Sequence, residues 1–111
     1  MSDDWVAALV EASAGRTGLG RTAVVAFAVG QTKQAVVTIV DGRVEGPSGD
    51  APGVTIPLTA KQLAAIVDGS ESLAEAFMRG DVKPEGSTGP LLAAVELFED
   101  ASFRQRLAAL V

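Results

Sequence analysis

The sequence predicts an α+β domain in which one β-sheet is covered by helices. Two runs rich in β-branched residues, 22–30 and 34–42, are separated by only three residues, as in an antiparallel hairpin. Later in the chain, Thr59 and Ser72 each stand three residues before a Gln or Glu, which is the pattern that begins a helix. Because 111 residues suit one domain, we expect these elements to share a single core.

The first half of the chain predicts one helix and three strands. Leu9 and Ala12 mark the apolar stripe of a helix over residues 3–14, within an N-terminal segment 1–15 that ends at a glycine. A loop follows, and then the hairpin of 22–30 and 34–42. The dipeptide at 41–42, Asp-Gly, predicts a tight turn toward residues 43–47. After a Gly- and Pro-rich loop, residues 54–58 predict a short strand, and Pro57 places it at a sheet edge or near a strand end.

The second half predicts mainly helices. A helix beginning after Thr59 stops at Gly69, and a shorter one beginning after Ser72 stops at Gly80. Residues 81–86 then predict a last strand. Pro90 suits the first turn of a further helix, whose apolar stripe ends at Phe98. A C-terminal helix over 100–111 is expected to begin at an aspartate cap.

Composition excludes several classes of function. The net charge is −5 and the nine Lys and Arg residues are scattered, which argues against nucleic-acid binding and against docking on an anionic membrane. The absence of Cys and His removes disulfides, thiolate chemistry, histidine triads and the usual zinc and haem sites. We therefore expect no metal and no cofactor. The lack of Cys favours a cytoplasmic location, and no apolar run is long enough to predict stable insertion into a membrane.

The acidic residues show no catalytic pattern. Asp41, Glu45 and Asp50 match no Ca²⁺ loop and suit turns instead. Asp81 and Glu85 would lie about 13 Å apart on a strand, too far to act as a pair. An enzyme with one carboxylate in an apolar pocket is left open, and a glutamate of the last long helix, Glu96, is its candidate.

An ordered set of residues in "VTIPLTAKQLAAIVDGSESLAEAFMRGDVKPEG" resembles the sterol carrier protein type 2 (SCP-2) family of lipid-transfer domains. The resemblance covers about residues 22–98. A strand ending in Thr leads to a helix, a glycine break, a second helix ending in Phe-Met-x-Gly, and a Lys-containing strand. The matching positions are Thr59, Leu63, Gly69, Ala76, Phe77, Met78, Gly80, Val82, Lys83 and Gly86.

The resemblance implies a single domain, 1–111, with its core at 22–98: a five-stranded, largely antiparallel sheet covered by helices around an apolar tunnel. It implies a non-catalytic carrier of fatty acyl chains, sterols or similar lipids. Phe77 and Met78 are expected to face the interior, and the tail residues Phe103, Leu107 and Leu110 to form a lid. The expected lining residues are aliphatic or aromatic: Val25, Phe27, Ile39, Ile56, Leu63, Ile66, Val67, Phe77, Met78, Val82, Leu92, Val95, Phe98, Phe103 and Leu107.

Three departures from the family pattern leave alternatives open. Pro84 stands where a branched apolar residue is usual, and Thr88 and Pro90 replace parts of a Gly-polar-Met-Gly-Leu run. The chain ends in "RLAALV" rather than a peroxisomal signal, which favours a bacterial-type stand-alone domain. A protein-interaction or homodimerisation module with a filled core, and an accessory domain of a lipid-metabolising enzyme, remain alternatives to a lipid carrier.

Overall fold

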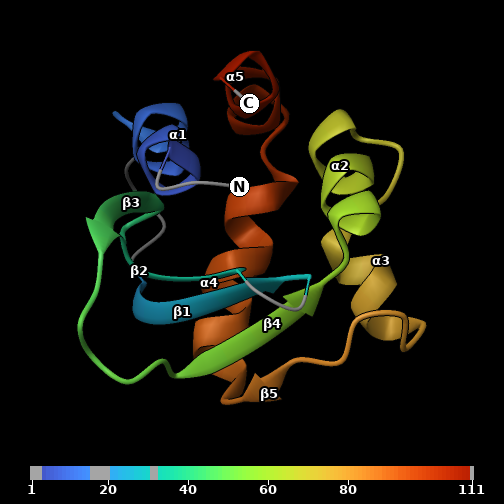
Figure 1. Ribbon diagram of the computed structural model, residues 1–111, viewed down its shortest axis with the longest axis horizontal. Helices are drawn as coiled ribbons and strands as arrows, with labels where there is room; N and C mark the ends of the chain where they lie inside the picture. Colours follow the sequence, from blue (N-terminus) through green and yellow to red (C-terminus); the bar gives the residue numbers. More distant parts are fainter. Residues whose placement is uncertain (1–3, 16–20, 31–32, 111) are drawn as a thin grey trace.

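The computed structural model describes residues 4–15, 21–30 and 33–110 (Figure 1). The ends of the predicted helical segments (1–3 and 111), the predicted loop at 16–20 and the hairpin turn at 31–32 lie outside the described residues. The elements are, in order, α1 (Asp4–Ser13), β1 (Thr22–Val29), β2 (Lys33–Val40), β3 (Arg43–Pro47), β4 (Val54–Leu58), α2 (Ala60–Asp68), α3 (Leu73–Met78), β5 (Glu85–Gly86), α4 (Thr88–Glu99) and α5 (Ala101–Leu110).

The sheet has five strands in the order β3-β2-β1-β4-β5. Strands β1 and β2 pair antiparallel along their whole length, from Thr22 opposite Val40 to Val29 opposite Lys33. The β1–β4 pairing is parallel, and the β2–β3 and β4–β5 pairings are antiparallel. The predicted class, an α+β fold with a largely antiparallel five-stranded sheet, is therefore confirmed.

The turn between β2 and β3 forms as the sequence predicts. Asp41 and Gly42 both have positive φ angles, 54° and 85°. Two consecutive residues in the left-handed region are typical of a type I′ turn, whose twist matches that of the strands it joins. Aspartate tolerates this region better than most residues and glycine enters it without steric cost, so the dipeptide itself specifies the turn.

The helix boundaries follow local signals in the sequence. Thr59 and Gln62 form a capping box, in which each side chain accepts from the backbone N–H of the other residue, and α2 ends at Gly69 with φ 87°. Ser72 Oγ accepts from Glu75 N–H at the start of α3. Asp100 Oδ1 accepts from Phe103 N–H, 3.0 Å away, at the start of α5. All these caps were expected from the sequence.

The helices pack on the sheet and on one another. Helix α4 contacts β1 and β4, and α1 lies against β3. Helix α5 lies between α1 and α2 and also contacts α4; Figure 1 shows α1, α5 and α2 as a row at the top, with α4 behind the strands. Within the described residues, no helix is long and apolar enough to cross a membrane.

The predicted strand over residues 81–86 is shorter in the structure. Only Glu85 and Gly86 pair with β4, opposite Thr55 and Val54. Pro84 lacks an N–H to donate to a ladder. The preceding residues form a turn, which Gln62 holds by donating from Nε2 to the carbonyl oxygen of Asp81 at 3.1 Å. Residues 81–84, which were predicted as strand, are therefore turn and coil.

Candidate functional site

Most of the predicted lining residues lie in one continuous apolar interior between the sheet and the helices. Val25, Phe27 and Ile56 of the central strands are completely buried. They belong to one cluster with residues of α2, α4 and α5. The remaining predicted lining residues in this cluster are Ile39, Leu63, Ile66, Val67, Val82, Val95, Phe98, Phe103 and Leu107. The structure thus brings together side chains from β1, β2, β4 and four helices or turns of the second half.

Three predicted lining residues are exposed instead. Phe77 is 40% exposed, Met78 80% and Leu92 38%, so the expectation that Phe77 and Met78 face the interior is wrong. Helix α3 has only six residues, and its buried face is set by Leu73 and Ala76. At about 100° per residue, Met78 points roughly opposite to that face and Phe77 lies at its margin. Leu92 is similarly turned about 100° from its buried neighbour Leu91.

Three phenyl rings connect the sheet to the last two helices. The rings of Phe27 and Phe98 have centroids 5.8 Å apart at 77°, and those of Phe98 and Phe103 are 5.4 Å apart at 83°. Both are edge-to-face contacts, which add about 0.5–1.5 kcal/mol each beyond the area that the rings bury. This stack fixes the start of α5 over the interior.

Helix α5 closes the interior between α1 and α2. Phe103 and Leu107 point inward and are 1% and 0% exposed, whereas Leu110 is 41% exposed. The two inward residues are four apart and so share one face of the helix. Two of the three residues expected to form a lid therefore point into the interior and Leu110 does not, and the lid itself stays a prediction.

One buried polar side chain in the described residues, Ser13, was missed by the sequence analysis. Its hydroxyl donates to Leu9 O at 2.8 Å and accepts from Val44 N–H at 2.8 Å. Val44 belongs to β3, the outer strand of the sheet, so Ser13 satisfies a backbone donor on that edge. A serine within an Ala- and Val-rich helix was the available signal, but nothing in the sequence names its partner strand.

Charged side chains fix the corner between α3 and β5. Arg79 donates to Glu71 Oε1 at 2.6 Å and to Asp81 Oδ2 at 3.0 Å, and Glu75 Oε2 lies 3.8 Å away. The hydrogen bond to Glu71, and then that to Asp81, raise the pKa of the Arg79 guanidinium. This network holds the turn in which Val82 is buried and Lys83 exposed.

The segment that departs from the family pattern packs tightly at the start of β4. A Cβ on Gly86 would lie 2.7 Å from Val54 Cα and closer still to Gly53 O, and Gly86 has φ 136°. A Cβ on Gly53 would lie 2.6 Å from Pro90 Cγ. Neither position has room for a Cβ. At Gly53 the space is taken by the ring of Pro90, so the first turn of α4 packs directly against the start of β4.

The carboxylates offer no catalytic arrangement in the described part of the chain. Glu96 does not lie in an apolar pocket, because its Oε1 accepts from Arg21 Nε at 2.7 Å and its side chain is 28% exposed. No group of three or more Asp and Glu residues among the described positions could hold a metal ion. What the described residues build is an apolar interior between the sheet and the helices.

Three surface grooves lie beside α1 in the described part of the chain. One has a volume of about 230 Å³ and is lined by Phe103 together with Ala12, Ala14, Gly15, Asp100, Ser102 and Arg106. Two others flank the outer side of the helix. Phe103, one of the predicted lining residues, thus borders the first of these grooves.

These features define a small α+β domain with an aliphatic interior closed by a C-terminal helix. A family model for the SCP-2 sterol transfer family matches residues 3–99, and the chain belongs to this family. The resemblance expected from the sequence is thereby confirmed. A comparison with curated proteins finds no match.

Solved structures share the fold at low sequence identity. A palmitated SCP2L2 protein from Aedes aegypti aligns with TM-score 0.67 and 15% identity, covering 90% of this chain and 96% of the other. The sterol carrier protein domain 2 of Helicoverpa armigera aligns with TM-score 0.59 and 21% identity over 88% and 85%. Sterol Carrier Protein-2 from Aedes aegypti in complex with palmitate aligns with TM-score 0.58 and 19% identity over 92% and 98%. They show that the fold is shared.

Proposed function

We propose that this protein is a non-catalytic, cytoplasmic carrier that binds one fatty acyl chain, sterol or similar apolar molecule between the sheet and helices α2, α4 and α5. The observation that carries the proposal is the continuous aliphatic interior closed by Phe103 and Leu107. Membership of the SCP-2 sterol transfer family supports it. The palmitate-bound structures from Aedes aegypti, which share the fold, point to the same ligand class.

The energetics permit binding if the ligand displaces the lid. Burying about 14 methylenes of palmitate contributes roughly 11 kcal/mol at ~0.8 kcal/mol each. Exposing the side chains of Phe103 and Leu107 costs about 3–6 kcal/mol together. Association costs at least about 4 kcal/mol more, which leaves at most about 4 kcal/mol and therefore a dissociation constant in the millimolar range or weaker. The free energy gained by burying a long acyl chain therefore exceeds the cost of exposing the two lid side chains. The gain from a short chain does not.

A titration of methyl-labelled protein with palmitate tests the site directly. Labelled Ile, Leu and Val methyl groups report separately on the interior and on the surface. We expect saturable NMR shifts at Ile56, Ile66 and Leu107, which are buried. The matched reporters are Val6 and Val10, which line an outer groove of α1 and should not shift. Saturable shifts confined to Val6 and Val10 would place the ligand on the surface and refute the interior site.

One observation favours the alternative of a filled core. The predicted lining residues pack against one another, and a 1% exposed phenylalanine and a 0% exposed leucine occupy the space under α5. If these side chains cannot be displaced, the same fold acts through its surface. Absence of saturable binding to a panel of fatty acids and sterols would decide for this alternative.

A further inference from the structure

Helix α1 forms an exposed ridge with an apolar groove on each side. The first groove, of about 670 Å³, is lined by Val6, Ala7, Val10 and Glu11 and by Pro47 of β3. The second, of about 360 Å³, is lined by residues from α1 and α5: Glu11, Ala14, Arg106, Ala109 and Leu110. Glu11 borders both grooves. The ridge and its grooves therefore form one continuous surface, which we call the α1–α5 face.

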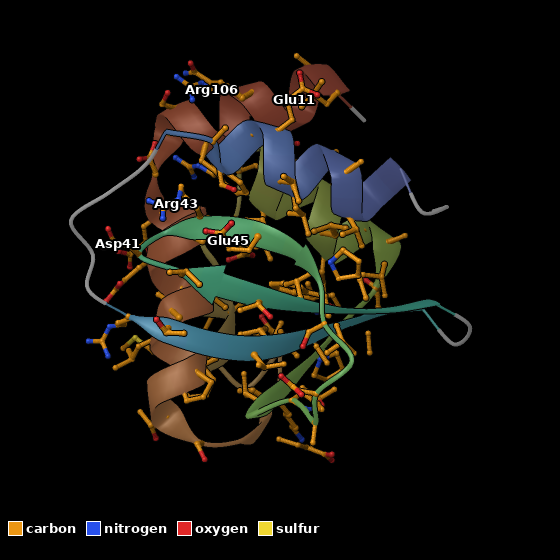
Figure 2. The ribbon with its side chains drawn as sticks, turned by 90° about the vertical axis from the view of Figure 1, so that its left-hand side faces the viewer. Glu11, Asp41, Arg43, Glu45 and Arg106 are labelled. Atoms are coloured by element: carbon orange, nitrogen blue, oxygen red, sulfur yellow. The ribbon has the colours of Figure 1, made fainter. Side chains whose placement is uncertain are left out.

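The two charged residues of this face have opposite signs and sit on different helices. Figure 2 shows Glu11 on α1 and Arg106 on α5, at the top of the molecule. The two helices run side by side in opposite directions, because Ala14 at the end of α1 borders the same groove as residues near the start of α5. Among the described residues, neither side chain has an ion-pair partner. Both side chains are exposed and available to pair with charges on another molecule.

We propose that the α1–α5 face binds a second copy of this chain. A two-fold axis that runs along the seam between the helices places α1 of each copy over α5 of the other. Glu11 of one copy then meets Arg106 of the other, and the reverse pair forms at the same time. A face that carries one acid and one base on opposite sides of its axis is self-complementary, which is the requirement for an isologous dimer.

The apolar residues of the face suit contact between helices. Val10 is half-buried and Leu110 is 41% exposed, and Ala7, Ala14 and Ala109 are small enough to let helices approach closely. The ridge of α1 can lie in the groove beside α5 of the other copy, as helices do when ridges pack into grooves. A second copy covers the exposed leucine at the same time as it pairs the two charges.

The size of the face predicts a weak dimer. Each helix has ten residues and is therefore about 15 Å long. At an interaxial distance of about 10 Å, the pair offers a face of roughly 300 Å² per copy. Stable interfaces bury about 800 Å² per partner, so we expect a transient dimer with a dissociation constant on the order of 100 µM. The net charge of −5 on each copy adds to the weakness.

Sedimentation equilibrium with charge reversals tests the proposal. Over about 10 µM to 1 mM, the unmodified chain should pass from monomer to dimer. Glu11→Arg places like charges opposite one another, and so does Arg106→Glu, so each should raise the dissociation constant about tenfold or more. The double variant restores both pairs with their signs exchanged and should recover most of the affinity. Circular dichroism shows whether each variant is folded.

Matched changes elsewhere on the surface serve as controls. Gln105→Glu alters the charge of α5 by one unit at an exposed position outside both grooves, as Arg106→Gln does inside one. Only the second should weaken the dimer. A monomer at every concentration would overturn the proposal, and so would a dimer whose affinity is unchanged by both single reversals. These outcomes do not depend on lipid binding, so failure of the carrier function would leave them unaffected.

Discussion

The contact between Gly53 and Pro90 predicts a specific pair of coupled substitutions. In Gly53→Ala, the new Cβ would lie 2.6 Å from Pro90 Cγ and 3.2 Å from Pro90 Cβ. The proline ring is fixed to the backbone of α4 and cannot rotate away like a flexible side chain. The start of β4 and the start of α4 must therefore separate by about 0.8 Å to reach ordinary contact, and overpacking of this kind costs about 1–3 kcal/mol.

Urea unfolding of the two single variants and the double variant measures this coupling. Pro90→Ala alone should cost about 0.4–1 kcal/mol, because proline restricts the unfolded chain. It also removes the ring atoms that meet the new methyl group. The double variant should thus be more stable than the sum of the single effects by about 1 kcal/mol or more. We expect the slope of free energy against urea to stay the same in all variants.

Gly49→Ala is the matched control, because no atom lies within 4 Å of the position of its Cβ. Gly49→Ala should leave the free energy of unfolding almost unchanged. Strictly additive effects of Gly53→Ala and Pro90→Ala would show that the ring does not limit this position. The reasoning about how α4 is seated on the sheet would then be refuted.

Three further predictions concern the edge strand, a helix end and the lid. Ser13→Ala should lower stability by about 1–3 kcal/mol in urea unfolding, because Val44 N–H loses its buried acceptor. Ser70→Ala should raise the pKa of Asp68 toward its ordinary value of 3.8 in an NMR titration, because hydrogen bonds from the Ser70 hydroxyl and N–H lower it. A lowered carboxyl pKa stabilises the fold above the unfolded value and ceases to do so as pH falls through the folded pKa, so Ser70→Ala should lose stability at neutral pH and the difference should vanish in acid. Leu107→Ala should cost about 2–5 kcal/mol in a thermal melt, because it empties a fully buried position under the lid.

Each of these predictions has a control variant or a defined contrary result. Ser102→Ala, at an exposed position, should leave stability unchanged where Ser13→Ala lowers it. An unchanged Asp68 titration in Ser70→Ala would show that the hydroxyl is not the main cause of the shift. Leu110→Ala removes the same atoms as Leu107→Ala at a position that is 41% exposed. Equal costs for the two leucines would contradict the placement of the lid.

Features encoded by neighbouring residues could be predicted from the sequence. The turn at Asp41 and Gly42, the capping box of α2 and the glycine that ends α2 each depend on residues within about one helical turn. The pairing of β1 with β2 follows from two β-rich runs joined by a short connection. These local preferences agree with the final structure, so sequence pattern alone locates the elements.

Features that depend on distant contacts could not be predicted in the same way. Ser13 is buried because Val44 of the outer strand reaches it, and no pattern near position 13 indicates this. Phe77 and Met78 were expected inside because they resemble a motif, but the short α3 turns Met78 away from the interior. The strand predicted at 81–86 is shorter in the structure, because Pro84 cannot donate to a ladder and Gln62 donates a hydrogen bond to the Asp81 carbonyl. Most of the residues predicted to line a cavity are buried, because aliphatic stripes that face a core are periodic in the sequence; their role in binding a ligand stays a prediction.

Native mass spectrometry of the protein mixed with palmitate tests the carrier function most directly. The monomer has a mass of 11.3 kDa, so one bound palmitate is readily resolved. We expect a saturable one-to-one adduct whose yield falls when a shorter fatty acid replaces palmitate, because fewer methylenes offset the cost of opening the lid. No adduct with palmitate or with any other fatty acid or sterol, under conditions that keep the protein folded, would contradict a lipid site in the interior.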